Sequence, residues 1–182
     1  MAQTNPKSVV VVGGGAAGAT IARTLSAKLK ASTATLTLVT ARPFALHFPA
    51  AARMTTTAEG RLEDKVLIPY DNLFLNGNGT LKVGRVIAIE HNKEGQAGVL
   101  VLSSGERVEY DILVLAPGSE WKGPLEFPDD HAAALEHIKT WRRNFENANT
   151  VILAGGSARG CGMVLRLHHP YGWLDVRLCC PA

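Results

Sequence analysis

The sequence predicts an α/β fold built on a parallel β-sheet with an inserted β-meander. Residues 8–12, a helical repeat after them and residues 34–39 form a strand–helix–strand unit, whose strands should be parallel. Apolar runs at 111–116 and 150–154, the first followed by Pro117-Gly118 and the second by Gly155, predict further buried strands. With 182 residues, 46% of them hydrophobic and 19% charged, the chain can bury a core without disulfides or metals.

The first predicted strand ends at a run of glycines that a helix follows. Ser8 to Val12 is a short β-branched run, and the chain breaks at Gly13. Small and apolar residues then recur at helical spacing, which predicts an amphipathic helix from about residue 16 to residue 30. Residues 34–39 alternate threonine with leucine or valine, and this alternation predicts the second strand.

A G-x-G-x-x-G motif lies between the first strand and the helix. Its first glycine allows a tight turn, its second lets a diphosphate approach the backbone, and its third lets helix and strand pack closely. The free N–H groups and the positive dipole end of the helix then face the phosphates. The flanking elements favour a dinucleotide site over a glycine-rich turn without a ligand. The residues expected to line this site are Gly13, Gly14, Gly15, Ala16, Ala17 and Gly18.

The end of the second strand lacks the acidic residue that usually holds the ribose hydroxyls in such sites. No Asp or Glu precedes Glu59, and the strand is followed by Thr40, Ala41 and Arg42. Thr40 could donate one hydrogen bond to a ribose, and Arg42 could contact a phosphate or stack on adenine. An arginine at this place favours NADP over NAD. These residues by themselves leave FAD and NADP as alternatives.

The rest of the chain predicts a long connection, a meander and a second strand–glycine opening. Residues 41–78 have weak periodicity and several prolines, which predicts a connection with two short helices. Three strands of a meander are predicted at 81–90, 98–102 and 107–110, with turns at 92–96 and 103–106. A helix capped by Asp129 or Asp130 should follow, with Leu135, Ile138, Trp141 and Phe145 along one side.

This order of elements resembles the two-dinucleotide-binding-domain flavoproteins of the pyridine nucleotide-disulphide oxidoreductase superfamily. The stretches VVVVGGGAAG, ARPF…HFPAAARM, LKVGRVIAIE and YDILVLAPGS are similar to the apoptosis-inducing-factor-like branch, including its ferroptosis-suppressor type. The second opening, VILAGGSARG at 151–160, matches the start of that family's NAD(P)H domain. The resemblance covers residues from about 8 to 160. It implies a Rossmann-like FAD-binding domain over 1–125 and the start of an NAD(P)H-binding domain over 126–182.

The resemblance also implies roles for particular residues. The glycine motif would hold the FAD diphosphate, and Arg53 matches an arginine that the family places against FAD, with a surface cation as the alternative. Val86 matches a position whose backbone pairs with the adenine edge, although strand core explains it equally well. Ala116 to Gly118 match a turn that passes under the nucleotide, where Pro117 replaces the usual threonine and removes an N–H and a hydroxyl. Thr40 stands where the family has an acid.

The activity that the resemblance implies is hydride transfer from NAD(P)H to FAD and on to a quinone-like acceptor. No cysteine precedes Cys161, so the 40–60 region holds no redox pair and the disulphide-reductase subclass is excluded. No catalytic residue is predicted, and His47, which would pass the flavin, is interpreted as a loop histidine. The alternatives are a non-catalytic nucleotide-binding or interaction module that retains only the Rossmann half, and an NADP-binding enzyme that uses Arg42.

The pattern departs from the family at its C-terminal end. Ser157 occupies the middle-glycine position of the second motif, where its side chain would obstruct a diphosphate. All three cysteines follow residue 160, and the expected helix fails beyond about Leu167. We therefore expect a truncated chain whose tail diverges from about residue 161, with weak FAD binding and impaired activity.

Composition excludes several other classes of function. The net charge of +3 is too small and too scattered for a nucleic-acid surface. The histidines lack metal-ligand spacing on one helix face, so no metal site is predicted. No apolar run approaches the roughly 20 residues of a membrane-spanning helix. A body without cysteine suits a reducing compartment, so we expect a cytoplasmic location, with mitochondrial or peripheral membrane association as alternatives.

Overall fold

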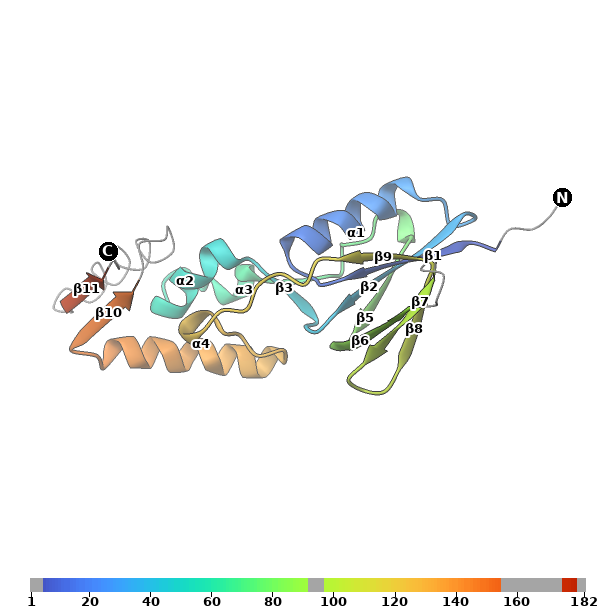
Figure 1. Cartoon of the computed structure of the whole chain (residues 1–182). Coiled ribbons are helices and arrows are strands. Elements are labelled where there is room, and N and C mark those ends of the chain that lie inside the picture. The colour runs from blue at the N-terminus through green and yellow to red at the C-terminus, as the bar shows by residue number, and fades with distance from the viewer. Residues whose placement is uncertain (1–4, 92–96, 155–174, 180–182) are drawn as a thin grey trace. The chain divides into compact units, whose positions relative to one another are not determined.

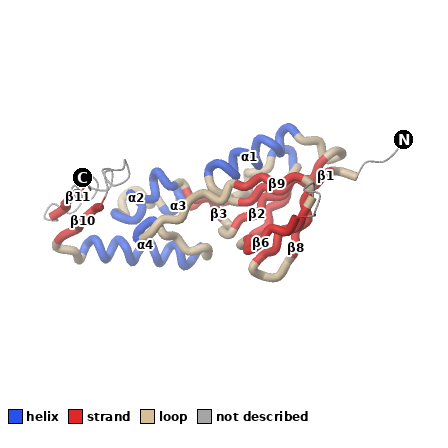
Figure 2. Tube along the Cα trace, in the orientation of Figure 1, coloured by secondary structure: helices blue, strands red, loops and turns tan. Residues whose placement is uncertain are grey.

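The chain folds into two compact units (Figure 1), and the computed structural model describes residues 5–91, 97–154 and 175–179. Unit 1 comprises Met1–Ala45 and Pro69–Ser119, and unit 2 comprises Leu46–Ile68 and Glu120–Ala182. Most of the described strands belong to unit 1, whereas the helices α2, α3 and α4 belong to unit 2 (Figure 2). The predicted division into an FAD domain and an NAD(P)H domain at residue 125 stays a prediction.

Unit 1 is built on a four-stranded sheet in the order β5-β2-β1-β9. All neighbours in it are parallel, which confirms the predicted α/β class with a parallel sheet. The predicted strand, helix and strand at the start of the chain are confirmed as β1, α1 and β2. The elements are β1 (Lys7–Val12), α1 (Ala16–Lys28), β2 (Ala34–Thr40), β5 (Thr80–Val83) and β9 (Ile112–Leu115).

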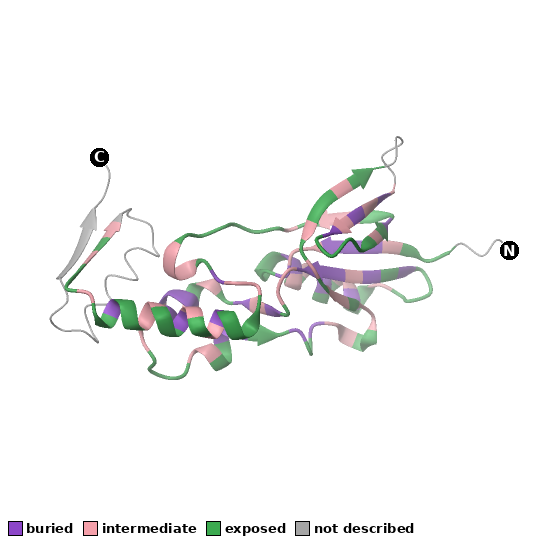
Figure 3. Ribbon diagram, turned by 90° about the horizontal axis from the view of Figure 1, so that it is seen from below, coloured by how far each residue is buried: buried purple, intermediate pink, exposed green. Residues whose placement is uncertain are grey.

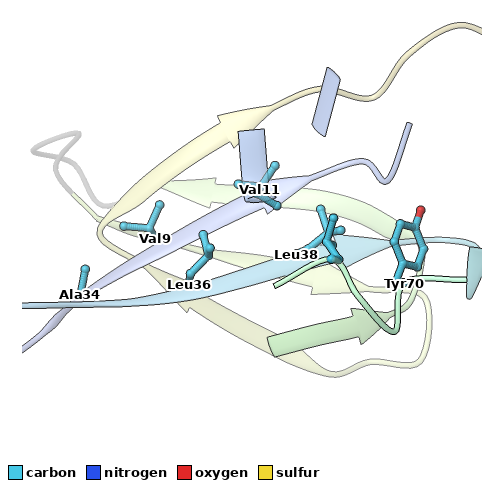
Figure 4. Packing of buried hydrophobic residues seen from close by; sticks show 8 residues of the cluster. Val9, Val11, Ala34, Leu36, Leu38 and Tyr70 are labelled. Atoms are coloured by element: carbon cyan, nitrogen blue, oxygen red, sulfur yellow. The ribbon is translucent and has the colours of Figure 1, made fainter. Parts of the chain in front are cut away.

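The central strand β1 is covered on both faces, which explains its unbroken valine run. Val9 and Val11 pack with Leu36 and Leu38 of β2 on one face (Figure 4). Ala22 of α1 belongs to the same cluster. On the other face, a second cluster packs against the meander and contains Val10, Val39, Leu100, Leu102 and Tyr110. Alternate residues of β1 therefore contribute to two different cores, as the two-residue period of a strand requires.

The meander is a three-stranded sheet in the order β6-β7-β8, paired antiparallel. Its strands are β6 (Val86–His91), β7 (Gly98–Leu102) and β8 (Arg107–Tyr110). The prediction of one strand over 81–90 is wrong, because the chain passes from the parallel sheet to the meander at Gly84. The N–H of Gly84 donates to the Thr40 carbonyl at 2.8 Å, and a Cβ on Gly84 would lie 2.9 Å from Leu102 Cδ1. The predicted turn at 92–96 lies outside the described residues.

Strand β9 is an edge strand of the described sheet rather than a fully buried one. It pairs only with β1 among the described strands, and Ile112 and Leu115 are 46% and 56% exposed. Its apolar sequence resembles that of β1, but a strand with one neighbour keeps one flank in solvent. The predicted strand is confirmed, and its predicted burial is wrong.

Unit 2 contains helices that the long connection and the C-terminal half of the chain supply. The two short helices predicted within 41–78 are confirmed as α2 and α3. The remaining described elements of the chain, of which the 3₁₀ turn η1 lies in unit 1, are β3 (Phe44–Leu46), α2 (Phe48–Thr56), α3 (Glu63–Val66), β4 (Leu67–Pro69), η1 (Leu75–Gly77), the 3₁₀ turn η2 (Gly123–Leu125), α4 (His131–Glu146), β10 (Thr150–Ala154) and β11 (Asp175–Cys179).

Helix α4 begins at the predicted cap, and two residues of the predicted side are buried, whereas Leu135 and Trp141 are half-buried. The Asp130 carboxylate accepts a hydrogen bond from the Ala133 N–H at 2.8 Å, which satisfies a donor of the first turn. Figure 3 shows that the buried residues of the helix alternate with exposed ones. Ile138 and Phe145 are buried, and Phe145 packs with Ala52 of α2. Trp141 contributes to the same cluster.

The C-terminal strands differ from the sequence-based expectation. Residues 150–154 form the predicted strand β10, but Ile152 is 68% exposed, so its predicted burial is wrong. Strand β11 pairs with β10 in parallel, within a tail for which no strand was predicted. The second glycine motif at 155–160, with Ser157, lies outside the described residues.

A half-buried ion pair joins three helices of unit 2. An Arg142 guanidinium nitrogen lies 2.8 Å from a Glu63 carboxylate oxygen, and the two side chains are 11% and 22% exposed. Arg142 Nε also donates to the Met54 carbonyl at 2.9 Å. The hydrogen bond from Arg142 holds the pKa of Glu63 below its ordinary value, although partial burial opposes this.

We expect Glu63→Gln to lower the free energy of unfolding by about 1–2 kcal/mol at neutral pH, because a charge-assisted hydrogen bond within unit 2 is lost. Glu59→Gln is the matched control, since its ion pair with Arg53 at 3.1 Å is exposed and should contribute less than about 0.5 kcal/mol. Urea denaturation measures both. Equal losses in the two variants would contradict the assignment.

The same pair should make stability depend on pH in the acid range. A folded-state pKa below the ordinary value of 4.5 means that the stabilisation is complete above that value. It is lost as the pH falls through the lower, folded-state pKa. Urea denaturation between about pH 6 and pH 3 should therefore show a steeper acid loss for the unaltered chain than for Glu63→Gln.

Candidate functional site

The glycine loop leaves the carboxyl end of β1 where the order of the sheet reverses. From this loop the chain runs through α1 to β2 on one side of β1, and β9 lies on the other side. In open α/β sheets, ligands bind outside the carboxyl ends of the strands at such a reversal. The topology therefore places the predicted motif where this class of fold binds its ligands.

Gly13 and Gly18 are required by close approaches of the backbone. Gly13 has a φ of 104°, and its N–H donates to the Val39 carbonyl at 2.8 Å. A Cβ on Gly13 would lie 2.1 Å from the Ala116 carbonyl oxygen, and one on Gly18 would lie 1.8 Å from the Gly13 carbonyl oxygen. The turn and the helix–strand packing that the motif predicts are thus present, and the Ala116 N–H donates to the Val12 carbonyl at 2.8 Å.

Gly15 differs from these glycines because the space in front of it is open. It is the N-cap residue of α1, no side chain caps the helix, and nothing lies within 4 Å of where its Cβ would be. Ala16 and Ala17 are exposed beside it. The first N–H groups of a helix have no partners within the helix, and they carry the positive end of its dipole. This geometry fits the diphosphate of a dinucleotide.

Tyr70 is a residue of the loop's surroundings that sequence reasoning missed. Its hydroxyl donates to the Gly14 carbonyl at 2.6 Å, and the residue is 7% exposed. The Thr40 side chain hydrogen-bonds the same hydroxyl. Burial raises the pKa of Tyr70, although the bond with Thr40 and the charge of Arg42 oppose this, so the hydroxyl stays protonated at neutral pH. Tyr70 follows a proline in a weakly periodic stretch, and no motif marks it.

The neighbourhood of Tyr70 also explains why residue 14 is a glycine. A Cβ on Gly14 would lie 1.9 Å from the Tyr70 hydroxyl oxygen and 2.5 Å from Thr40 Oγ1. Thr40 itself is 6% exposed at the end of β2. The three glycines in a row therefore serve different ends: a turn at Gly13, a buried polar contact at Gly14 and an open face at Gly15.

The other predicted residues lie at different places. Val86 is the first residue of β6 and is half-buried against the meander core. The backbone N–H of Arg42 donates a hydrogen bond to Thr40 Oγ1 at 3.4 Å. Gly118 has a φ of 76° with open space around it. Arg53 lies on α2 in unit 2 and forms an ion pair with Glu59. The predicted contacts of these residues with a nucleotide stay predictions.

Among the described residues, no group of His, Cys, Asp and Glu could hold a metal ion. No described helix has the length and apolar character that crossing a membrane requires.

Comparison with known proteins places the sequence among oxidoreductases. A family model for pyridine nucleotide-disulphide oxidoreductases matches residues 7–167. The chain is 40% identical over 107 residues to the FAD-dependent oxidoreductase FVFD30 of Flammulina velutipes, covering 59% of this chain and 33% of that protein. It is 30% identical over 172 residues to ferroptosis suppressor protein 1 of Taeniopygia guttata, covering 93% of this chain and 43% of that protein. The chain thus spans less than half the length of these relatives.

A solved structure supports the fold independently of sequence. Reduced CoADR-RHD of Bacillus anthracis matches with a TM-score of 0.69 at 19% sequence identity, covering 100% of this chain and 34% of that chain. The Rossmann-like fold and the resemblance inferred from the motifs are confirmed.

Replacing Gly15 with alanine should separate ligand binding from folding. Gly15 has a φ of −71°, which alanine adopts readily, so we expect the free energy of unfolding to fall by less than about 1 kcal/mol. The new methyl group would project into the open space before the amides, so ADP, used as a diphosphate probe, should bind at least about tenfold more weakly. Calorimetric titration and urea denaturation measure the two effects.

Gly18→Ala is the contrasting variant. Its Cβ would lie 1.8 Å from a backbone oxygen, so we expect the fold to be destabilised by about 3 kcal/mol or more. A Gly15→Ala chain that binds ADP as tightly as the unaltered chain would show that the diphosphate does not lie there.

Proposed function

Because this chain belongs to the pyridine nucleotide-disulphide oxidoreductase family, we propose that it forms the FAD-binding part of an NAD(P)H oxidoreductase with a quinone-like acceptor. The observation that carries the proposal is the uncapped N-terminus of α1, which opens at Gly15 into free space at the carboxyl end of β1. The name of the Flammulina velutipes relative supports FAD as the cofactor.

The described residues suggest how FAD would be held. The amides that follow Gly14 would bind the diphosphate, with Gly13 and Gly18 keeping the loop close to the sheet. Ala116 lies beside this loop, so the turn from Ala116 to Gly118 would pass under the nucleotide. Val86 and Arg53 are proposed to contact FAD from the resemblance alone.

When bound, FAD would supply the redox chemistry, in which the hydride of NAD(P)H provides two electrons and one proton, solvent provides a second proton, and a quinone is reduced to a hydroquinone. The residues of this chain bind and orient the nucleotide. A cysteine pair takes no part within residues 1–160, because no cysteine occurs there. The proposal therefore contains no disulfide exchange, despite the family's name.

The cofactor at the glycine loop distinguishes this proposal from the NADP alternative. Arg42 follows β2, near the place where an acidic residue would bind the free hydroxyls of a ribose. Its positive charge lowers the pKa of Tyr70, against the effect of burial. We nevertheless propose FAD here and NAD(P)H as co-substrate, because the family match extends from residue 7 to residue 167 and includes the second predicted opening. The cytoplasmic location stays a prediction.

We expect FAD to bind the whole 182-residue chain in a one-to-one complex. Titration of the chain into FAD, followed by flavin fluorescence, gives the dissociation constant, and NADPH should compete at least about tenfold more weakly. Gly15→Ala is the matched control and should weaken FAD in the same proportion as ADP. Tighter binding of NADPH than of FAD would overturn the choice of cofactor in favour of the NADP alternative.

Quinone reduction tests the acceptor separately. With FAD added, the chain should oxidise NADH or NADPH only when a quinone is supplied. Equal oxidation without a quinone, in air, would point to oxygen as the acceptor and contradict this part of the proposal.

A further inference from the structure

The hydroxyl of Tyr70 contacts the glycine loop from a segment 56 residues further along the chain. We propose that Tyr70 is a positioning residue for the diphosphate site and that Thr40 acts through it. In this proposal Tyr70 sets the direction of the amide that follows Gly14, and Thr40 sets the hydroxyl of Tyr70. The inference rests on the proposed function, because it concerns the same site.

The geometry of one peptide bond carries the first step. The carbonyl of Gly14 and the N–H of Gly15 belong to the same planar trans peptide, so they point in opposite directions. A hydrogen bond of 2.6 Å from Tyr70 holds that carbonyl on the buried side of the loop. The N–H of Gly15 is therefore turned away from Tyr70, toward the side where a Cβ on Gly15 would meet nothing within 4 Å.

Tyr70 can hold the loop because its own place is set by packing. Its ring belongs to the core cluster that contains Val11, Leu38 and Leu73, and Figure 4 shows it beside Leu38 near the end of β2. A ring with a 7% exposed surface has little freedom to move, and its hydroxyl points to the loop.

The segment after Tyr70 is tied to α1 at several points along the helix. Arg23 donates to the Asn72 carbonyl at 2.6 Å, and the Leu75 N–H donates to Ser26 Oγ at 2.9 Å. The Asn78 side chain then donates to the Leu29 carbonyl at 2.6 Å, next to the end of the helix. These bonds hold Tyr70 to the same helix whose N-terminus forms the site.

Thr40 is placed to act on Tyr70 rather than on a ribose. It is 6% exposed, and its Oγ1 lies beside the Tyr70 hydroxyl, since a Cβ on Gly14 would be 2.5 Å from the first and 1.9 Å from the second. A hydrogen bond between the two side chains lowers the pKa of Tyr70, against the effect of burial. Thr40 stands where such sites usually have an acidic residue, so a direct hydrogen bond from Thr40 to a ribose was one expectation. The structure favours a different role, in which a buried threonine and tyrosine orient the amide that meets the diphosphate.

Tyr70→Phe tests the proposal, and Tyr110→Phe is its matched control. Both tyrosines are nearly buried, at 7% and 5% exposed, and both use their hydroxyl groups in hydrogen bonds within the protein. The Tyr110 hydroxyl lies 2.9 Å from His91 Nδ1 in the meander and does not contact the glycine loop in the described structure. Both variants remove only an oxygen atom, so their effects on overall stability should be similar.

The measurement is the dissociation constant of FAD and of ADP for the whole chain, with the thermal unfolding midpoint of each ligand-free variant recorded beside it. We expect Tyr70→Phe to weaken both ligands at least about tenfold and Tyr110→Phe to change them less than about twofold. A purely structural role would lower the two midpoints without separating the two affinities. Equal affinities in Tyr70→Phe and the unaltered chain would overturn the inference alone.

An unaltered chain that binds neither FAD nor ADP would overturn the proposed function as well, so the two failures are distinguishable. Thr40→Val supplies a second variant and a double-mutant cycle. If Thr40 acts through Tyr70, the double variant should bind FAD no more weakly than Tyr70→Phe does. Losses that multiply would mean that Thr40 contacts the ligand independently, and would overturn this part of the proposal.

Discussion

The fold of unit 1 depends on how closely three pieces of backbone meet at the end of β1. The glycine turn, the first turn of α1 and the chain leaving β9 approach one another so closely that Cβ atoms at Gly13 and Gly18 would overlap backbone oxygens. This contact lets α1 cover one face of the sheet while the meander covers the other. The same contact presents the helix N-terminus to solvent, so the packing that completes the core also creates the candidate site.

Much of this architecture could be predicted because its signals are local. The valine run of β1, the glycine spacing and the Asp130 cap each report a backbone requirement that acts over a few residues. The break at Gly84 was hidden because Leu81 to Glu90 are mostly strand-forming residues, and only their pairing in the fold shows that β5 joins one sheet and β6 another. The exposure of β9 was hidden too, because an apolar run does not reveal how many neighbours a strand has.

The backbone geometry of the candidate site could be predicted from the sequence, whereas the side-chain contacts around it could not. Each motif glycine is where spacing places it, yet the sequence does not reveal that Gly14 faces two buried hydroxyl groups. Tyr70 carries no signal of its own, since its partner is 56 residues away and the contact forms only when β2 and the loop are in place. The role of Thr40 changes for the same reason, because a donor that suits a ribose suits a tyrosine equally well.

The bonds between α1 and the stretch after Tyr70 have a consequence for how this region can vary. Tyr70 is attached to the loop at one end of the helix, while Leu75 is attached to Ser26 and Asn78 to Leu29 near the other. The stretch from Tyr70 to Asn78 is therefore attached at fixed points to α1 and to the glycine loop before it. Asn76 and Gly77 have positive φ angles of 58° and 65°, which restrict the residues that fit there, and an insertion or deletion would shift the tyrosine out of register with the glycines.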